Sequence, residues 1–418
     1  MNLLDIRYSL RMLRKAPGFT FVAILTLALG IGANSTVFSW INATLLNPIP
    51  GMSRPSQVVC VMNGADSSIS YPDFKDLRAR NHSFSDMTAF GLWPMSLTGQ
   101  GKPARVWGTV VSANYFDVLG IKPYLGRAFL PSEDGAVNGA PVAVISHRLW
   151  QGRFGGNPAI VGSTVHINTH PFTIVGVMPP IFQGSYSGLR TDLWVPVVMV
   201  PELDPQGAKL LSDRGTTWLN SDGRLRPNVG RIQAQLELNA LVQQLAREFP
   251  DSHKGQVQMT LYPLWRAPNG GNAFFSILLP ILMGLASVVL LLASANIANL
   301  LLARSVSRRK EIAVRLSLGA SRARLVRQFM AEQLVLALGG GALALAATVW
   351  TARTFMDFAP TSNLPIYVFV PIDRAVVLAT FLFSVLTCAL FGILPALRAS
   401  ALDPVSILKD ESAGIAGG

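Results

Sequence analysis

The sequence predicts an α-helical membrane protein with four transmembrane helices (one, then three) and a large extracytoplasmic α+β domain inserted between helices 1 and 2. Four stretches contain no charged residue, and each is long enough to cross a bilayer core, which takes about 20 apolar residues in a helix. These stretches are 19–46, 271–303, 333–352 and 375–397. Between the first and second of these stretches lies the segment 47–270. It mixes charged, polar and apolar residues, as is typical of a folded domain in water.

Charge fixes the expected orientation. The net charge is +12, and the segment 304–332 alone holds eight Lys or Arg against two acidic residues. Short loops rich in Lys and Arg stay in the cytoplasm, so we expect both termini to be cytoplasmic and 47–270 to lie outside. No aromatic residue interleaves these cations, which argues against a nucleic-acid partner.

The N-terminal region predicts a surface helix followed by a span. Residues 1–18 mix apolar and basic side chains, as in a cytoplasmic amphipathic helix on the membrane, and Pro17-Gly18 is expected to end it. A signal peptide is the alternative, but 19–46 far exceeds the usual apolar core of about 7–15 residues. Asn34 is expected to hydrogen-bond a neighbouring helix rather than to form a transport site.

The segment 47–270 shows both strand and helix patterns. The clearest helix is 231–249, and Ser146 is the expected N-cap of a helix that ends near 154. Six residues are predicted to form one apolar face of the first helix: Ile232, Leu236, Leu238, Leu241, Leu245 and Phe249. Strands are expected at 105–112, 141–145, 164–167, 172–177, 194–200 and 257–262, and further helices at 71–80 and 114–119. Two subdomains are expected, divided near 104 and again within 201–230.

No constellation of catalytic residues is apparent. The five His lack metal-ligand spacing, the two Cys, Cys60 and Cys388, fall in different regions, and neither G-x-S-x-G nor G-x-x-x-x-G-K-[ST] occurs. The pair Glu133-Asp134 is expected to lie in a solvated loop. The sequence therefore predicts a non-enzyme without catalytic residues, metal site or cofactor.

The basic segment 304–332 has internal order. Apolar residues recur at helical spacing at Ile312, Leu316, Leu325 and Phe329. Two short amphipathic helices are expected, with Gly319 as a C-cap of the first and Ser321 as the N-cap of the second. One interpretation is a topology signal only, and the other is a docking surface for a cytoplasmic partner, which alone explains the helical register and the ordered turn.

The remaining segments complete the predicted membrane region. Asn296 and Asn299 in the second span are expected to hydrogen-bond another helix. The residues 353–374 form an outer loop and 398–418 a cytoplasmic tail. No charged residue lies inside any predicted span, which argues against an ion or proton relay in the membrane.

Several long motifs resemble those of one family. They are RYSLRMLRKAPGFTFVAILTLALGIGANSTVFSWINATLLNPIP at 7–50, VVSANYFDVLGIKPYLGRAF at 110–129, RRKEIAVRLSLGASRARLVRQFMAE at 308–332 and LPALRASALDPVSILK at 394–409. Together they resemble the permeases of MacB-type ABC transporters, the FtsX-like superfamily, and within it the acidobacterial orphan-permease branch. The resemblance implies a protein of the bacterial inner (cell) membrane with a periplasmic core, made of a porter-like part and a smaller α/β part.

The resemblance also implies a mechanism and partners. A cytoplasmic ABC ATPase subunit would contact the basic segment, and its closure would move the outer domain by mechanotransmission. By position in the motif, the contact residues are Arg308, Arg309, Lys310, Glu311, Arg315, Leu318, Gly319 and Ala320. A homodimer or a pair with a similar permease is expected, as is a periplasmic adaptor protein. The chain departs from the family in carrying no fused ATPase and only one copy of the unit that the orphan-permease branch repeats.

Two other functions stay open. An FtsX-like signalling or scaffold membrane protein that regulates an extracytoplasmic partner would share this layout. A membrane-anchored enzyme would need a catalytic constellation, which the sequence does not offer.

Overall fold

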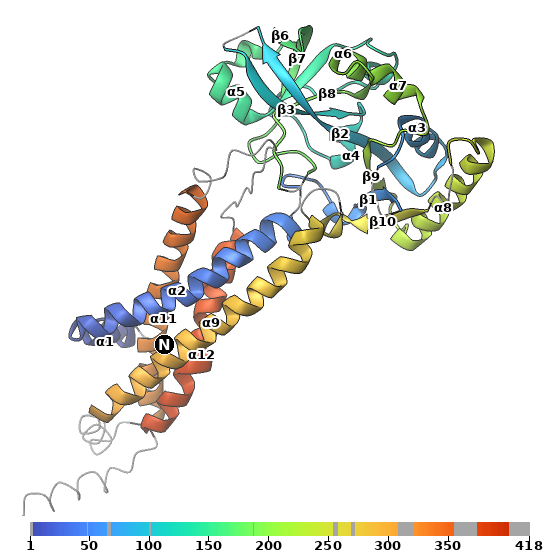
Figure 1. The fold of residues 1–418 in the computed structure, drawn as a ribbon. Helices are drawn as coiled ribbons and strands as arrows, with labels where there is room; N and C mark the ends of the chain where they lie inside the picture. Colours follow the sequence, from blue (N-terminus) through green and yellow to red (C-terminus); the bar gives the residue numbers. More distant parts are fainter. Residues whose placement is uncertain are drawn as a thin grey trace, which may run out of the picture. The chain divides into compact units, whose positions relative to one another are not determined.

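The computed structural model describes nine stretches of the chain (Figure 1): residues 3–47, 49–64, 68–99, 102–186, 188–253, 258–268, 272–307, 321–354 and 374–400. The chain divides into two compact units. The membrane unit comprises Met1–Asn42, Ile277–Ala359 and Val370–Gly418, and the head unit comprises Ala43–Ser276 and Pro360–Phe369.

The head unit is built on one mixed sheet of ten strands. Their order along the sheet is β10-β1-β9-β2-β3-β8-β5-β7-β4, and β6 pairs with both β2 and β7. The strands are β1 Val58–Asn63, β2 Phe84–Thr98, β3 Ala104–Val111, β4 Leu125–Gly126, β5 Val142–Ile145, β6 Thr164–Ile167, β7 His170–Val177, β8 Leu193–Pro196, β9 Asn220–Leu225 and β10 Met259–Pro263. The sheet runs through the whole unit, so the predicted division near 104 falls within the β2–β3 hairpin.

A hydrophobic core lies on each face of this sheet. In β1, Val59 and Val61 belong to one core, and Val58, Cys60 and Met62 belong to the other. This alternation follows from the pleat of a strand, which points successive side chains to opposite faces. A strand that is apolar at every position is therefore buried on both sides.

Helices cover both faces of the sheet (Figure 1). They are α3 Tyr71–Arg80, α4 Tyr115–Leu119, α5 His147–Phe154, α6 Val200–Leu203, α7 Gly207–Ser212 and α8 Arg231–Glu248. The predicted N-cap of α5 is confirmed, because Ser146 Oγ accepts a hydrogen bond of 3.1 Å from the Leu149 amide. The predicted hairpin between β6 and β7 is confirmed as well, and its turn residues Asn168 and Thr169 have positive φ.

Two predictions for the head unit need correction. The expected strand 194–200 ends at Pro196, and a 3-10 turn at Val197–Met199 leads directly into α6. Proline explains the change, since it lacks the N–H that a strand would need, while Pro201 suits the first turn of a helix.

The predicted apolar face of α8 is correct for four of its six residues, since Leu238 and Leu245 are buried and Leu241 and Phe249 pack against the same core. It is wrong for the other two. The helix buries Ala234, Leu238, Val242 and Leu245. Ile232 and Leu236 lie on another face and are 75% and 67% exposed. The prediction therefore joined residues from two different apolar stripes of this helix into a single face.

The membrane unit consists of long helices. They are α1 Leu3–Arg14, α2 Pro17–Ile41, which continues as one π-helical turn over Asn42–Leu46, α9 Asn272–Ser307, α11 Arg322–Thr354 and α12 Arg374–Ser400. The expected break at Pro17-Gly18 is confirmed, but its bounds differ from the prediction. Helix α1 ends at Arg14 and Pro17 opens α2, where its fixed φ suits a first helical turn. Helix α1 packs against α2 and α11, and its Leu13 is buried among their side chains.

Three segments are long and apolar enough to cross a bilayer: Pro17–Leu46, Phe274–Leu300 and Val326–Thr351. The expected fourth span falls in α12, where the apolar stretch among the described residues, Arg374–Ala389, is shorter. That the chain crosses the membrane four times remains a prediction.

Candidate functional site

The predicted contact site for an ATPase lies outside the described residues. Arg308, Arg309, Lys310, Glu311, Arg315, Leu318, Gly319 and Ala320 all fall in the stretch 308–320. The structure does describe the two helices on either side of this stretch. Helix α9 ends at Ser307 and α11 begins at Arg322.

Helix α11 confirms one prediction and corrects another. Ser321 caps it as expected, since the Arg324 amide lies 3.4 Å from Ser321 Oγ and 3.0 Å from the Ser321 carbonyl oxygen. The helix is not short, however, and runs unbroken for 33 residues to Thr354. The predicted boundary at 332 marks a change from basic to apolar residues, which does not interrupt the backbone. A helix of this length spans about 50 Å.

Asn34 of α2 links this helix to α9. Its Nδ2 donates a hydrogen bond of 2.7 Å to the Ala286 carbonyl of α9 and one of 2.9 Å to the Gly30 carbonyl of its own helix. Ser287 of α9 also donates to Asn34 Oδ1, at 3.3 Å. The predicted role of Asn34 as a link between helices is confirmed.

The next two residues of α2 reach two further helices. Thr380 Oγ1 of α12 donates to Ser35 Oγ at 2.8 Å. Thr36 Oγ1 lies 3.2 Å from Thr348 Oγ1 of α11. Successive residues of an α-helix point about 100° apart, so three residues in a row can face three neighbours. We call Asn34, Ser35 and Thr36 the polar node.

Glycines allow the same helices to approach one another closely. A Cβ atom on Gly340 of α11 would lie 2.8 Å from Leu27 Cβ of α2, closer than real side chains come. A Cβ on the next residue, Gly341, would overlap Ser384 Oγ of α12. Small residues at helix interfaces are typical of membrane proteins, where lipid offers no hydrophobic drive for association.

The polar node links helices and contains no group suited to acid–base chemistry. Its side chains are amides and hydroxyls that are engaged with other helices, and none of them titrates in the physiological range. Among the described residues, no group of three His, Cys, Asp or Glu could hold a metal ion. The arrangement therefore joins α2 to α9, α11 and α12 at defined points, so that movement of one helix acts on the others.

The head unit contains a buried acid. Asp222 in β9 stands opposite Cys60 of β1 and Thr88 of β2. Neither carboxyl oxygen meets the geometry of a hydrogen bond. Burial raises the pKa of Asp222 to about 7, and the neighbouring Cys60 thiol opposes this shift. Burial, followed by the nearby Asp222 charge, raises the pKa of the Cys60 thiol. The carboxyl is therefore neutral in mildly acidic solution and becomes costly to bury as the pH rises.

Sequence comparison relates both units to known proteins. The profile of the MacB-like periplasmic core domain matches residues 20–251, and that of the FtsX-like permease C-terminal region matches residues 283–404. The uncharacterized ABC transporter permease YknZ of Bacillus subtilis is 26% identical over 302 residues, which cover 72% of this chain and 69% of YknZ. The macrolide export ATP-binding/permease protein MacB of Escherichia coli K12 is 27% identical over 307 residues, 72% of this chain and 43% of MacB.

The matched region thus spans less than half of the length of the MacB relatives. Among solved structures, the periplasmic region of MacB from Actinobacillus actinomycetemcomitans matches 51% of this chain and 91% of that chain. Its sequence identity is 17% and its TM-score is 0.39, too low to support a statement about the fold.

Proposed function

The chain belongs to the family of MacB/FtsX-like permeases, and we propose that it couples ATP hydrolysis by a separate ATPase to motion of its head unit. As a member of this family with several apolar helices, it is a multi-pass protein of the bacterial inner membrane and an ABC-type permease subunit. Membership of the acidobacterial orphan-permease branch stays a prediction. The relatives do not favour an FtsX-like scaffold as the alternative.

The observation that carries this proposal is the continuity of α9 and α11. Helix α9 runs for 36 residues from Asn272, close behind the edge strand β10, to Ser307, where the predicted contact segment begins. Helix α11 leaves that segment and crosses the membrane unit without a break. A displacement of the predicted contact segment would therefore move both α9 and α11. The polar node joins these two helices to α2, which leads into the head unit.

The ATPase is proposed to bind at Arg308, Arg309, Lys310, Glu311, Arg315, Leu318, Gly319 and Ala320. No G-x-x-x-x-G-K-[ST] motif for binding nucleotide phosphates occurs in residues 1–418. The concentration of positive charge in 304–332 supports a cytoplasmic location for this segment and for both termini.

A second permease copy, or a similar permease, is proposed to pack against α9. Asn296 and Asn299 were expected to bond another helix, but within this chain both are exposed. An amide that faces lipid has no hydrogen-bond partner, and a neighbouring helix would supply one. A periplasmic adaptor protein remains a further proposed partner.

Pull-down of the tagged protein from native membranes tests the proposal. We expect a P-loop ATPase to co-purify, and we expect the charge reversal Arg308→Glu, Arg309→Glu and Lys310→Glu to reduce its recovery. A matched control reverses three exposed cations of the head unit: Lys102→Glu, Lys122→Glu and Lys209→Glu. The proposal fails if no ATPase is recovered, or if both triple variants recover the same amount as the original chain.

A further inference from the structure

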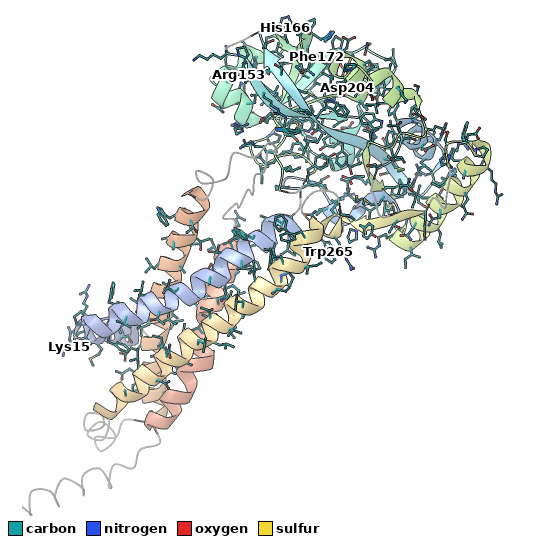
Figure 2. All side chains as sticks on the ribbon, in the orientation of Figure 1. Lys15, Arg153, His166, Phe172, Asp204 and Trp265 are labelled. Carbon is teal, nitrogen blue, oxygen red and sulfur yellow. The ribbon has the colours of Figure 1, made fainter. Side chains whose placement is uncertain are left out.

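A cavity of about 570 Å³ lies in the head unit, close to where the chain enters and leaves it. Leu45 and Leu46 line it from the end of the first apolar segment, and Leu264 and Trp265 line it from the segment that leads into α9. Trp265 is labelled in Figure 2. The other lining residues are Pro55, Ser56, Val58, Val59, Leu225, Val229, Arg231 and Pro263. The volume is within the usual range of small-molecule sites, about 300–1,000 Å³.

Along the chain, the cavity is flanked by two apolar segments that are long enough to cross a bilayer. Leu46 is the last residue of the membrane-spanning segment Pro17–Leu46, and its side chain is 58% exposed. Trp265 is 46% exposed, a few residues before the next such segment begins at Phe274. Tryptophan is enriched at membrane–water interfaces, where its ring is partly apolar and its N–H meets water. These two spans make lipid a natural apolar ligand for residues next to them in the chain.

One cation lines the cavity, and others are close to it in the chain. Arg231 is exposed and is the one charged residue among those that line the cavity. Arg54 and Arg266 are adjacent in the chain to two other lining residues. Burial, and then the charge of Arg54, lower the pKa of Arg224 nearby, as expected where cations gather without acids to balance them. This charge complements an anionic headgroup.

We infer that the cavity is a binding site for an anionic phospholipid of the adjoining leaflet. One acyl chain would occupy the apolar interior between Leu225 and Trp265, and the phosphate would face Arg231. The inference rests on the membrane topology of the proposed function, but not on coupling to an ATPase. A chain that binds no ATPase could still bind lipid here, and a chain that binds no lipid here could still bind an ATPase. The failure of one proposal therefore leaves the other intact.

Photo-crosslinking of the full chain in lipid nanodiscs tests the site. The probes are a phosphatidylglycerol and a phosphatidylcholine that carry the same diazirine-labelled acyl chain, and mass spectrometry identifies the labelled peptides. We expect labelling of the peptides that contain Leu46 and Trp265, about fivefold stronger for the anionic probe, as one nearby cation would give.

Two variants separate the charge from the cavity. Arg231→Gln should bring labelling by the anionic probe down to the level of the neutral one. Ser56→Trp, at an exposed lining position, should fill the cavity and abolish labelling by both probes. The matched controls Arg247→Gln and Gln243→Trp change exposed positions of α8 that do not line the cavity, and both should label like the original chain.

Four results would overturn the inference. In the first, the two probes label the chain equally, with no change in Arg231→Gln. That result would indicate unspecific contact with lipid. Labelling that survives Ser56→Trp would place the acyl chain elsewhere. Full competition by soluble glycerol phosphate would indicate a site for a free phosphate, and crosslinks confined to a second protein copy would indicate a protein occupant.

Discussion

The two units of this permease hold together by different means. The head unit has a ten-stranded sheet with a large hydrophobic core on each face. The described membrane helices share one smaller apolar cluster and also meet through glycines and a few hydrogen bonds. In water the hydrophobic effect drives such cores together, but in lipid it does not act between helices. The head unit is thus held together by two continuous cores, and the described membrane helices by a smaller set of close contacts.

Ion pairs reinforce the head unit. Arg214 contacts Asp73 at 2.6 Å, and His253 lies 3.2 Å from the same carboxylate. The Arg214 guanidinium also stacks over the Phe249 ring, at 3.8 Å from its centroid. These contacts tie α3 to the end of α8, so the helices that cover the sheet are joined to each other as well as to the core.

The largest expected effect is a dependence of the stability of the head unit on pH. Asp222 binds its proton up to about pH 7 in the fold, against 3.8 in its ordinary state, so the fold holds more protons than the unfolded chain between these values. The stabilisation is complete below 3.8 and is lost as the pH rises through about 7, on the order of 4 kcal/mol in all. Thermal unfolding followed by tryptophan fluorescence should show a less stable head at about pH 8 than at about pH 5.

Asp222→Asn should remove most of this pH dependence, since the amide stays neutral. Asp213→Asn is the matched control, because Asp213 is exposed to solvent and its lowered pKa, due to hydrogen bonds from Thr216 and Gly215, places its titration below this window. An undiminished pH dependence in Asp222→Asn would contradict the assignment.

The next effect is confined to the membrane unit. Gly340→Leu should destabilise it by about 2 kcal/mol, because the new side chain would meet Leu27 and the α2 backbone. The chain has one buried free cysteine in each unit, Cys60 in the head and Cys388 in the membrane unit, and mass spectrometry can follow the labelling of each. We expect faster labelling of Cys388 alone.

Gly284→Leu provides the control for this substitution. Gly284 lies on an exposed face of α9 with nothing within 4 Å of an added Cβ, so the variant should label like the original chain. Equal effects at Gly340 and Gly284 would show that close packing between helices does not hold the membrane unit.

The smallest expected effect concerns the polar node. Asn34→Ala should destabilise the membrane unit by about 1 kcal/mol, the usual range for hydrogen bonds between membrane helices. Thr26→Ala is its control, since Thr26 is exposed and its hydroxyl donates only within its own helix, to the Val22 carbonyl. The rate of labelling of Cys388 should rise in Asn34→Ala and not in Thr26→Ala. A rise in Thr26→Ala alone would show that the polar node does not stabilise the membrane unit.

The sequence identified part of this arrangement. Asn34 was recognisable as an amide within an apolar stretch, and the cap at Ser321 followed from local chemistry. Ser35 and Thr36 were not recognisable, because their partners Thr380 and Thr348 are 345 and 312 residues away and serine and threonine are common in spans. Asp222 was missed for a related reason, since its burial depends on the strand order β1–β9–β2.

Periodicity and composition had limits of their own. In α8, Ile232 and Leu236 repeat at the same spacing as the buried residues, and spacing alone cannot tell which stripe meets the sheet. In α11, the change from basic to apolar residues marks the membrane surface but carries no signal that the backbone bends. The predicted short helix and the predicted span are therefore one element.

The central claim, that α11 transmits motion from its basic end, is tested most directly by breaking this helix before the span. Gln328→Pro removes a backbone hydrogen bond and kinks the helix at a cost of about 3 kcal/mol, and Gln328→Ala is the matched control. Spin labels at the exposed positions Lys122 of the head unit and Gly284 of α9 report the distance between the units, with and without ATP, in the complex with the co-purified ATPase. We expect an ATP-dependent change in distance in the original chain and in Gln328→Ala, and no change in Gln328→Pro although the ATPase still binds. A change of the same size in Gln328→Pro would contradict the claim.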